Sequence, residues 1–199
     1  MILYDSHSSG NAYKVRLLLA LLGSDYQRVE MDIDAGATRT PEFLAKNPNG
    51  RIPVLERDDG RLLAESNAIV FYLAQGTPYL SDDPWTRGLT LQWMFFEQYS
   101  HEPFIAVSRY ILTHLPADSA RRAELPRLSP RGHDALAVME QHLSAQRWFA
   151  GNAFSVADIA LYTYTHVAHE GGFDLTPYAG VRDWIRRCAE RPGHISIDA

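Results

Sequence analysis

The sequence predicts an α/β N-terminal domain followed by an all-helical C-terminal domain. In the first third of the chain, short apolar or alternating strand-like segments are interspersed with helix-like segments. From the stretch TPYLSDDP at residues 77–84 onward, strand signals stop and helical signals continue. We therefore expect two domains, at residues 1–76 and 87–199, joined by a linker at residues 77–86.

The first three elements indicate a βαβ unit. A short apolar strand is expected at residues 2–5, a helix at residues 12–22 and an alternating strand from Tyr26. A connection of this kind places the two strands in parallel, with a right-handed crossover. A polar loop and a short helix at residues 41–46 follow.

The next segment is typical of a β-hairpin that leads into a helix. The strands IPVL and RLLA flank the turn DDG, and the helix is expected to begin at Glu65 or Ser66. Pro53 opens its strand, where a missing N–H is tolerated. Either isomer of the Ile52–Pro53 bond is compatible with the sequence.

The C-terminal part is expected to contain at least four helical stretches, separated by turns rich in proline or glycine. One of them begins in FSVADIALY, a capping box in which Ser155 caps the helix and Asp158 reaches back. This motif favours a structural role over a ligand site. The four stretches are residues 85–112, 130–145, 156–169 and 177–190.

Composition and charge exclude several classes of protein. An apolar content of 46% in 199 residues is sufficient for hydrophobic cores, and a net charge of −5 without a basic block argues against nucleic acid and membrane as partners. The single cysteine, Cys188, excludes an internal disulfide and a multi-cysteine metal site. No export signal and no apolar window of about 18 to 20 residues is present, so we expect a cytoplasmic protein.

Hydroxyl residues precede the first helix, at the carboxyl end of the first strand. The segment from Ser8 and Ser9 to Asn11 offers donors at the edge of the sheet where parallel α/β proteins bind ligands. A plain helix cap is the alternative, and for such a cluster taken alone it is the commoner role. Position by itself leaves both roles open.

A second helix start combines a charge with a hydroxyl. Ser66 offers an N–H and a hydroxyl to a carboxylate, and Glu65 offers a negative charge to an ammonium group. Together they complement the head group of an α-amino acid, although a capping role is again the commoner one for the pair in isolation.

Two other kinds of catalytic site are disfavoured. The eight histidines form no HExxH motif and no Cys/His metal spacing, so we expect no metal site. A serine hydrolase of the α/β type would show G-x-S-x-G, which is lacking, and His7 lies too close to Ser9 along the chain to serve its hydroxyl.

Four motifs, in matching order and spacing, resemble the cytosolic glutathione transferases. They are SSGN before the first helix, NPNGRIPVL, ESNAIVFYLA and the capping box SVADIAL. The resemblance covers nearly the whole chain and is closest to bacterial nu-, zeta- and theta-like members that use a hydroxyl residue. It implies a thioredoxin-like N-terminal domain, an all-helical C-terminal domain, glutathione as co-substrate, a role in detoxification and a homodimer.

The resemblance also assigns residues to glutathione. Pro53 is similar to the cis-proline that precedes the third strand, and Ile52 to the residue whose backbone pairs with the cysteinyl unit. Glu65 and Ser66 match the pair that holds the γ-glutamyl amino and carboxylate groups.

The thiol-activating group follows from the same resemblance. Ser9 falls on the catalytic serine of zeta- and theta-like members and on the threonine of nu-like members, and Asn11 on the asparagine that nu-like members bring to the thiol. Mammalian-type members use a tyrosine in this region, and Tyr4 lies in the first strand. Gly10 departs from the zeta pattern SSC, which leaves subgroup and substrate open.

A hydroxyl is energetically sufficient for this chemistry. A free thiol has a pKa of about 8.5, and lowering it by about two units takes roughly 2.7 kcal/mol. A hydrogen bond to a charged acceptor contributes about 1.5 to 3 kcal/mol, and a helix N-terminus about 0.3 to 2 kcal/mol. Ser9, aided by Asn11 or by backbone N–H groups, therefore needs no general base.

Further residues are expected around the two ends of the substrates. The resemblance implies that Arg39 and Arg51 contact the glycyl carboxylate of glutathione. A small electrophile is expected between the domains, beside Phe104, Arg109 and Tyr110. Glutathione-dependent disulfide reduction, cis–trans isomerisation and a non-catalytic ligand-binding module are the alternatives to transferase activity.

Overall fold

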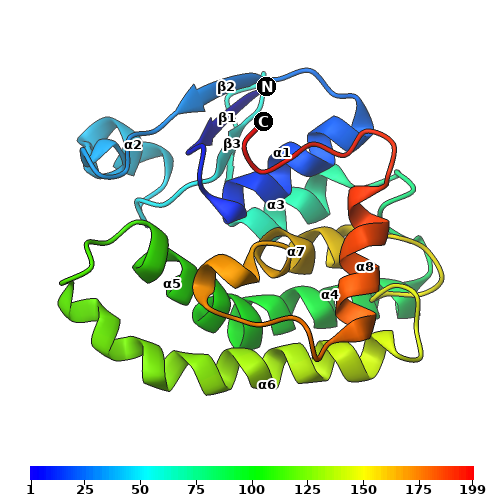
Figure 1. Cartoon of the computed structure of the whole chain (residues 1–199). Helices are drawn as coiled ribbons and strands as arrows, with labels where there is room; N and C mark the ends of the chain where they lie inside the picture. The colour runs from blue at the N-terminus through cyan, green and yellow to red at the C-terminus, as the bar shows by residue number, and fades with distance from the viewer. The chain divides into compact units, whose positions relative to one another are not determined.

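A mixed four-stranded sheet, in the order β2-β1-β3-β4, organises the N-terminal part of the chain (Figure 1). The computed structural model describes all 199 residues. β1 (Ile2–Asp5) lies parallel to β2 (Gln27–Glu30), which confirms the predicted βαβ unit. β3 (Val54–Glu56) runs antiparallel to β1 and to β4 (Leu62–Ala64), which confirms the predicted hairpin.

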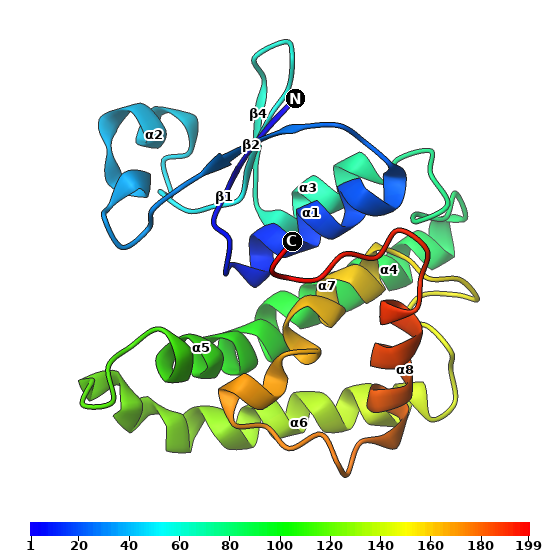
Figure 2. The same ribbon diagram turned by 45° about the horizontal axis from the view of Figure 1, so that its top comes forward.

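Helices cover this sheet. α1 (Gly10–Leu22) and α3 (Ser66–Leu73) lie side by side (Figure 2). α2 (Pro41–Lys46) follows a short 3-10 turn, Ala37–Arg39, and packs against the other side of β1, where the Tyr4 ring meets Phe43 edge-on with centroids 5.9 Å apart. Successive side chains of a strand point to opposite faces, so the neighbouring Leu3 points away from α2. Leu3 is fully buried.

Contacts divide the chain into two compact units. The first contains Met1–Gln75 together with the C-terminal tail Pro192–Ala199, and the second contains Gly76–Arg191. The prediction that residues 87–199 form a single domain is therefore wrong for the tail. The expected linker at residues 77–86 belongs to the second unit.

Two side chains of α1 hold the tail on the first unit. Tyr13 Oη donates a hydrogen bond to Ile195 O at 2.6 Å, and Arg16 Nη2 donates one to Ile197 O at 2.6 Å. Arg16 is also paired with the buried Asp5 at 2.8 Å. A buried cation needs oxygen partners, and the tail supplies one of them from a distant part of the sequence.

The second unit is built from helices, as predicted. Loops connect these helices, with a π-helical segment at Glu97–His101 and 3-10 turns at Ala120–Glu124 and Ala168–Gly171. The long helices are α4 (Pro84–Phe96), α5 (Glu102–Thr113), α6 (Leu125–Leu143), α7 (Val156–Thr165) and α8 (Ala179–Ala189).

The helix expected at residues 85–112 is interrupted. Between α4 and α5 the chain makes one π-helical turn, Glu97–His101, directly before Pro103 in the first turn of α5. Proline has no N–H for the hydrogen bond to the fourth residue before it, and its ring crowds that carbonyl group. A local widening of the helix accommodates both effects.

The start predicted for the next helix, at Pro130, is also wrong. α6 begins at Leu125, with Pro126 in its first turn and Pro130 inside the helix. The stretch LPRLSP at residues 125–130 therefore forms the first turns of α6. A proline in the first turn removes no helical hydrogen bond, so Pro126 is the residue that fits the helix start.

The predicted capping box at the start of α7 is present. Asp158 Oδ2 accepts hydrogen bonds from Ser155 N at 2.9 Å and from Ser155 Oγ at 3.2 Å. Its other oxygen, Oδ1, accepts from Trp184 Nε1 at 2.9 Å and from Phe149 N at 3.2 Å. Burial raises the pKa of Asp158 to about 6, although these hydrogen bonds lower it.

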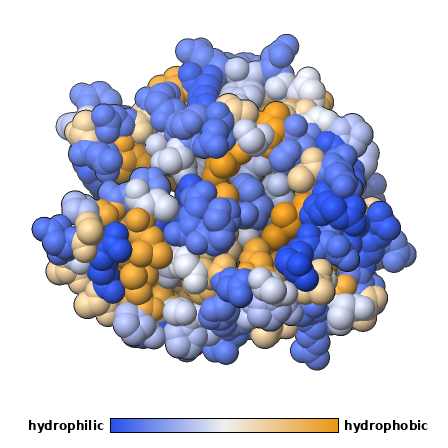
Figure 3. Space-filling model, viewed as in Figure 1, coloured by the Kyte–Doolittle hydropathy of each residue, from blue (hydrophilic) through white to orange (hydrophobic).

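The surface seen in Figure 3 is mixed in character. Hydrophilic residues predominate on this face, and hydrophobic residues form patches between them. None of the helices combines the length and the hydropathy that a membrane crossing requires.

Candidate functional site

One edge of the sheet gathers the residues that the sequence singles out in the N-terminal unit. Tyr4 of β1 is paired with Val54 of β3, and Val54 with Ala64 of β4. The next residues beyond this row are Asp5, Pro53 and Glu65. The SSGN segment, the Ile52–Pro53 bond and the Glu65–Ser66 pair therefore follow from the same edge.

Ser9 is the N-cap of α1. Its backbone is extended, with φ −75° and ψ 116°, and its hydroxyl oxygen accepts a hydrogen bond from Ala12 N at 3.3 Å. A hydroxyl group has one donor and two acceptor positions, so Ser9 can cap the helix through its oxygen and donate its proton to an anion. The helix N-terminus favours an anion at the same place.

Asn11 and Ser66 are in direct contact, although 55 positions separate them in the sequence. Ser66 Oγ donates to Asn11 Oδ1 at 3.2 Å. Lys14, which is fully buried, donates from Nζ to Asn11 Oδ1 at 2.9 Å and to Ser66 Oγ at 3.4 Å. These contacts join the start of α1 to the start of α3.

The orientation of the Asn11 amide follows from these contacts. Its carbonyl oxygen accepts from Lys14 and from Ser66. Oxygen and nitrogen lie at opposite corners of one planar group, so the NH2 end of Asn11 is directed away from Lys14. An amide NH2 group is a donor.

Glu65 has an unusual backbone. Its φ of 69° is the single positive φ among the residues other than glycine. Such a conformation costs about 1 to 3 kcal/mol in a side-chain-bearing residue and is found mainly at functional sites. The Glu65 side chain is exposed, and Ser66, which begins α3, is buried to 7% exposure.

The two predicted cations border one turn. Arg39 is exposed and donates from Nη1 to Asn49 O at 3.2 Å, and the Arg51 carbonyl accepts from Asn47 Nδ2 at 2.8 Å. Gly50, with φ 61°, lies between Asn49 and Arg51; a Cβ atom there would come within 2.9 Å of Thr38 O. Glycine is therefore required where Arg39 crosses this turn.

The Ile52–Pro53 peptide bond is cis, which confirms what the resemblance implies for Pro53. Tyr4 is engaged elsewhere: its Oη donates to Glu56 Oε2 at 2.7 Å, and Lys46 Nζ donates to the same oxygen at 2.8 Å. This bond holds the Lys46 pKa above its usual value and the Glu56 pKa below its usual value. Tyr4 thus links β1 to β3 and α2.

The three residues expected at the electrophile lie on α5. Arg109 Nε donates to Glu170 Oε2 at 2.6 Å, Arg131 lies over the Phe104 ring at 5.1 Å, and Tyr110 stacks on His114 at 5.2 Å. Two cavities of about 380 and 390 Å³ are present in the second unit, and neither is lined by these residues. Their role toward a substrate stays a prediction.

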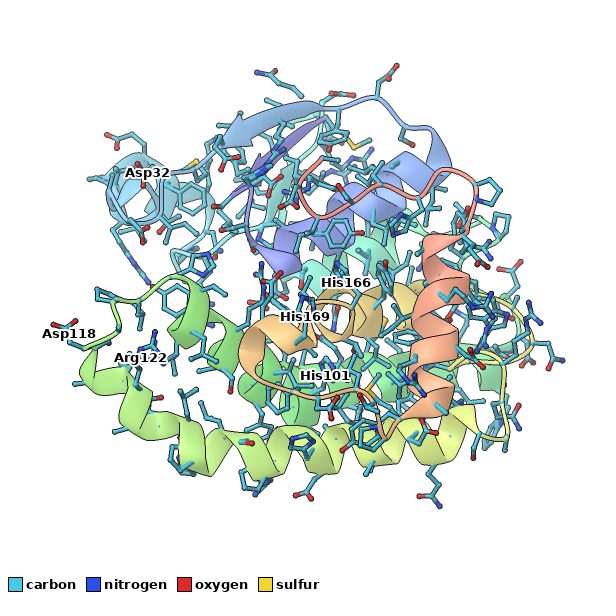
Figure 4. The ribbon with its side chains drawn as sticks, in the orientation of Figure 1. Asp32, His101, Asp118, Arg122, His166 and His169 are labelled. Atoms are coloured by element: carbon cyan, nitrogen blue, oxygen red, sulfur yellow. The ribbon has the colours of Figure 1, made fainter.

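Two of the labelled histidines, His101 and His166, form hydrogen bonds within the second unit (Figure 4). His101 is fully buried, with Nε2 2.9 Å from Thr165 Oγ1, and His166 Nδ1 lies 2.8 Å from Tyr162 O. His169 is exposed in the turn after α7. No three His, Cys, Asp or Glu side chains are grouped so that they can hold a metal ion.

Sequence reasoning missed Lys14. A signal was available, because a lysine within the almost continuously apolar segment AYKVRLLLALL is buried unless the helix is exposed on that side. Its contact with Ser66 was not foreseeable, because Ser66 comes from a different helix.

Comparison with known proteins identifies the family. The glutathione S-transferase N-terminal domain matches residues 1–75, and the glutathione S-transferase C-terminal domain matches residues 97–192. The chain belongs to the glutathione S-transferase family. A crystal structure of glutathione S-transferase from Pseudomonas fluorescens is similar to it, with 51% identity, a TM-score of 0.95 and 98% of each chain covered.

Two curated relatives of this chain carry different names. The disulfide-bond oxidoreductase YfcG of Escherichia coli is 30% identical, over 92% of this chain and 87% of the relative. Maleylacetoacetate isomerase of Pseudomonas aeruginosa is 32% identical, over 96% of this chain and 92% of the relative. Membership confirms the thioredoxin-like and helical fold and supports glutathione-dependent activity at the level of the family.

Proposed function

We propose that this protein conjugates glutathione to small electrophiles and stabilises the glutathione thiolate with Ser9 and Asn11. One observation carries the proposal: Asn11 and Ser66, 55 positions apart, meet at 3.2 Å at the starts of two helices. This contact brings the residues expected at the thiol beside those expected at the γ-glutamyl group.

Each part of glutathione has a chemical counterpart at this edge of the sheet. Glu65 offers its carboxylate to the α-amino group, and Ser66 offers its N–H and hydroxyl to the α-carboxylate. The Ile52 backbone pairs with the cysteinyl unit. Arg39 and Arg51, which border the Gly50 turn, provide positive charge for the glycyl carboxylate.

The thiolate is held by donors and needs no base from the protein. The thiol proton leaves to solvent, and the sulfur anion accepts hydrogen bonds from the Ser9 hydroxyl and from the Asn11 NH2 group. With an aryl halide, the sulfur then attacks the ring carbon, a C–S bond forms, and the halide departs with the electron pair of the broken bond.

The test separates binding from chemistry. Calorimetry should detect glutathione at millimolar concentration, and conjugation should be measured with a panel of aryl halides, epoxides and enones. Ser9→Ala and Asn11→Ala should each lower the rate while glutathione still binds. Undiminished conjugation in both variants overturns the roles of Ser9 and Asn11, and an absence of glutathione binding favours a non-catalytic ligand-binding module.

Disulfide reduction is the second candidate, favoured by the similarity to a protein named disulfide-bond oxidoreductase. Cys188 is only 2% exposed, and burial raises the pKa of its thiol, so it is poorly suited to attack a disulfide. Two successive glutathione molecules would supply the electrons and leave as glutathione disulfide. Reduction of hydroxyethyl disulfide by glutathione in a Cys188→Ala variant tests this route.

Cis–trans isomerisation, favoured by the second curated relative, is tested with maleylacetoacetate.

We also propose that the protein acts in the cytoplasm, in detoxification, as a homodimer. Trp85, Phe95 and Tyr99 are large aromatic residues with exposures of 76%, 70% and 83%, and all three belong to α4 or to the π-helical turn after it. Exposed aromatic groups of this size are typical of interface residues. Light scattering should give the mass of a dimer, and the double variant Phe95→Glu, Tyr99→Glu should shift it toward the monomer.

A further inference from the structure

Lys14 is a buried cation on the helix that begins at the proposed site. It lies on α1 between Asn11 and Arg16 and has no exposed surface. Lys14 and Lys46 are the two lysines of the chain. Burial of an ammonium group is unfavourable unless oxygen atoms surround it, so a lysine in this place needs an explanation.

The contacts of Lys14 connect the two halves of the proposed glutathione site. Its Nζ donates to Asn11 Oδ1 at 2.9 Å and to Ser66 Oγ at 3.4 Å, and Ser66 Oγ donates to Asn11 Oδ1 at 3.2 Å. The three side chains thus form a closed triangle, in which a single ammonium group fixes the orientation of an amide and of a hydroxyl.

We propose that Lys14 is a positioning residue that lowers the pKa of the glutathione thiol through Asn11; this inference rests on the proposed function. By holding the carbonyl oxygen of Asn11, Lys14 directs the NH2 group of that amide toward the ligand side. Without Lys14, the amide can turn its oxygen toward the sulfur, and an oxygen there repels a thiolate. The positive charge acts in the same direction, because buried charges are weakly screened.

Ser66 connects Lys14 to the part of the proposed site that binds the γ-glutamyl group of glutathione. The Ser66 oxygen accepts from Lys14, and its proton goes to Asn11. When a carboxylate accepts the hydrogen bond from the Ser66 hydroxyl, Asn11 Oδ1 keeps the hydrogen bond from Lys14 and the amide stays in place. Lys14 therefore holds the thiol-activating group steady while the γ-glutamyl group binds.

The test is the pKa of the bound glutathione thiol, measured from the ultraviolet absorbance of the thiolate against pH. Lys14→Met removes the charge and the donors, Lys14→Gln keeps a donor without the charge, and Lys14→Arg keeps the charge. The thiol pKa is expected to rise by about one pH unit in Lys14→Met, a tenfold lower thiolate population on the rising part of the curve. Lys14→Gln should be intermediate and Lys14→Arg close to the wild type.

A double-mutant cycle separates positioning from a purely structural role. If Lys14 acts through Asn11, Asn11→Ala should raise the thiol pKa by less than half as much in the Lys14→Met background as in the wild type. Lys46→Met is the matched control, since it also removes a hydrogen-bonded lysine from the first unit, and it should leave the thiol pKa unchanged.

The outcomes distinguish the inference from the proposed function. If the wild type does not bind glutathione, the proposed function fails and the inference fails with it. If the wild type binds glutathione and the thiol pKa is the same in all folded Lys14 variants, the inference alone is overturned. Should Lys14→Met not fold, the comparison of Lys14→Gln with Lys14→Arg decides in the same way.

Discussion

Two α-helices of this protein begin with a serine cap, and the two caps differ in what surrounds them. At α7, Ser155 is 6% exposed, and Asp158 accepts hydrogen bonds from its N–H and from its hydroxyl. At α1, Ser9 is partly exposed and its hydroxyl accepts one hydrogen bond, from Ala12 N. Ala12 occupies in α1 the position that Asp158 occupies in α7.

The two caps differ in whether the chain itself supplies an anion at the helix N-terminus. A carboxylate at the third helical position occupies the N-terminal donors, so α7 holds its own anion. An alanine there leaves the positive end of α1 to an anion from outside the chain. A serine before a helix is therefore best judged together with the residue three positions after it.

The largest effect on stability is expected when the carboxylate of Asp158 is removed from the cap of α7. Asp158→Ala leaves Trp184 Nε1, Phe149 N and Ser155 N without their buried acceptor, and this should lower the free energy of unfolding by about 3 to 5 kcal/mol. Urea unfolding followed by tryptophan fluorescence measures it, because all four tryptophans lie in the second unit.

Asp83→Ala is the control for this variant. Asp83 caps α4 with an exposed side chain that accepts from Thr86 N at 2.8 Å, so its removal should destabilise the protein less than the removal of the buried Asp158. Equal losses in the two variants would contradict the idea that burial, and not the cap itself, makes the α7 box strong.

Asp158 in the cap of α7 should also make the free energy of unfolding depend on pH. The pKa of Asp158 is about 6 in the folded protein, against 3.8 for an ordinary aspartate, so the folded state binds this proton more tightly than the unfolded state. Its contribution, up to about 3 kcal/mol, is fully present below pH 3.8 and is lost as the pH rises through 6.

The measurement is the free energy of unfolding between pH 4 and 7 in the wild type and in Asp158→Asn. As the pH rises through 6, the wild type should lose stability relative to Asp158→Asn. The nearby Cys188 thiol does not contribute, because burial and Asp158 hold its pKa well above the usual value. Parallel curves would show that Asp158 does not titrate in this range.

Local motifs predicted much of the fold. The bounds of β1 and α2 are as expected, and the capping box at Ser155 is present because its residues are neighbours in the sequence. The π-helical turn before Pro103 and the proline inside α6 were not predicted, because a proline in a helical pattern can be met by a stop, a bend or a local widening.

The candidate site divides along the same line. Glu65 and Ser66 are adjacent, so their pairing was visible in the sequence, whereas the contact of Asn11 with Ser66 depends on how α1 packs against α3. The tail Pro192–Ala199 illustrates the same limit, since it follows the last helix but packs on the first unit. Contacts between distant segments are not encoded in any local pattern.

Substitution of Ser9, the cap of α1, should lower the rate of conjugation more than it lowers stability. Ser9→Ala is expected to lower kcat/KM for conjugation about 10- to 100-fold, because a hydrogen bond to a charged sulfur is lost, and to lower stability by about 1 kcal/mol. Ser155→Ala should lower stability by about 1 to 2 kcal/mol and leave the specific activity within about twofold of the wild type. A similar loss of activity in both variants would mean that Ser9 acts only through folding.

The smallest change in stability is expected for Ser9→Gly, and it separates the two roles of this residue. Glycine is nearly as good a helix cap as serine, so the free energy of unfolding should fall by only a few tenths of a kcal/mol. Glycine has no hydroxyl to donate to a thiolate, so conjugation should be as slow as in Ser9→Ala. Urea unfolding and kcat/KM, measured on the same preparation of Ser9→Gly, test both statements together. A Ser9→Gly protein that regains wild-type activity along with wild-type stability would assign Ser9 to capping alone, and the thiolate would then depend on Asn11 and the N–H groups of α1.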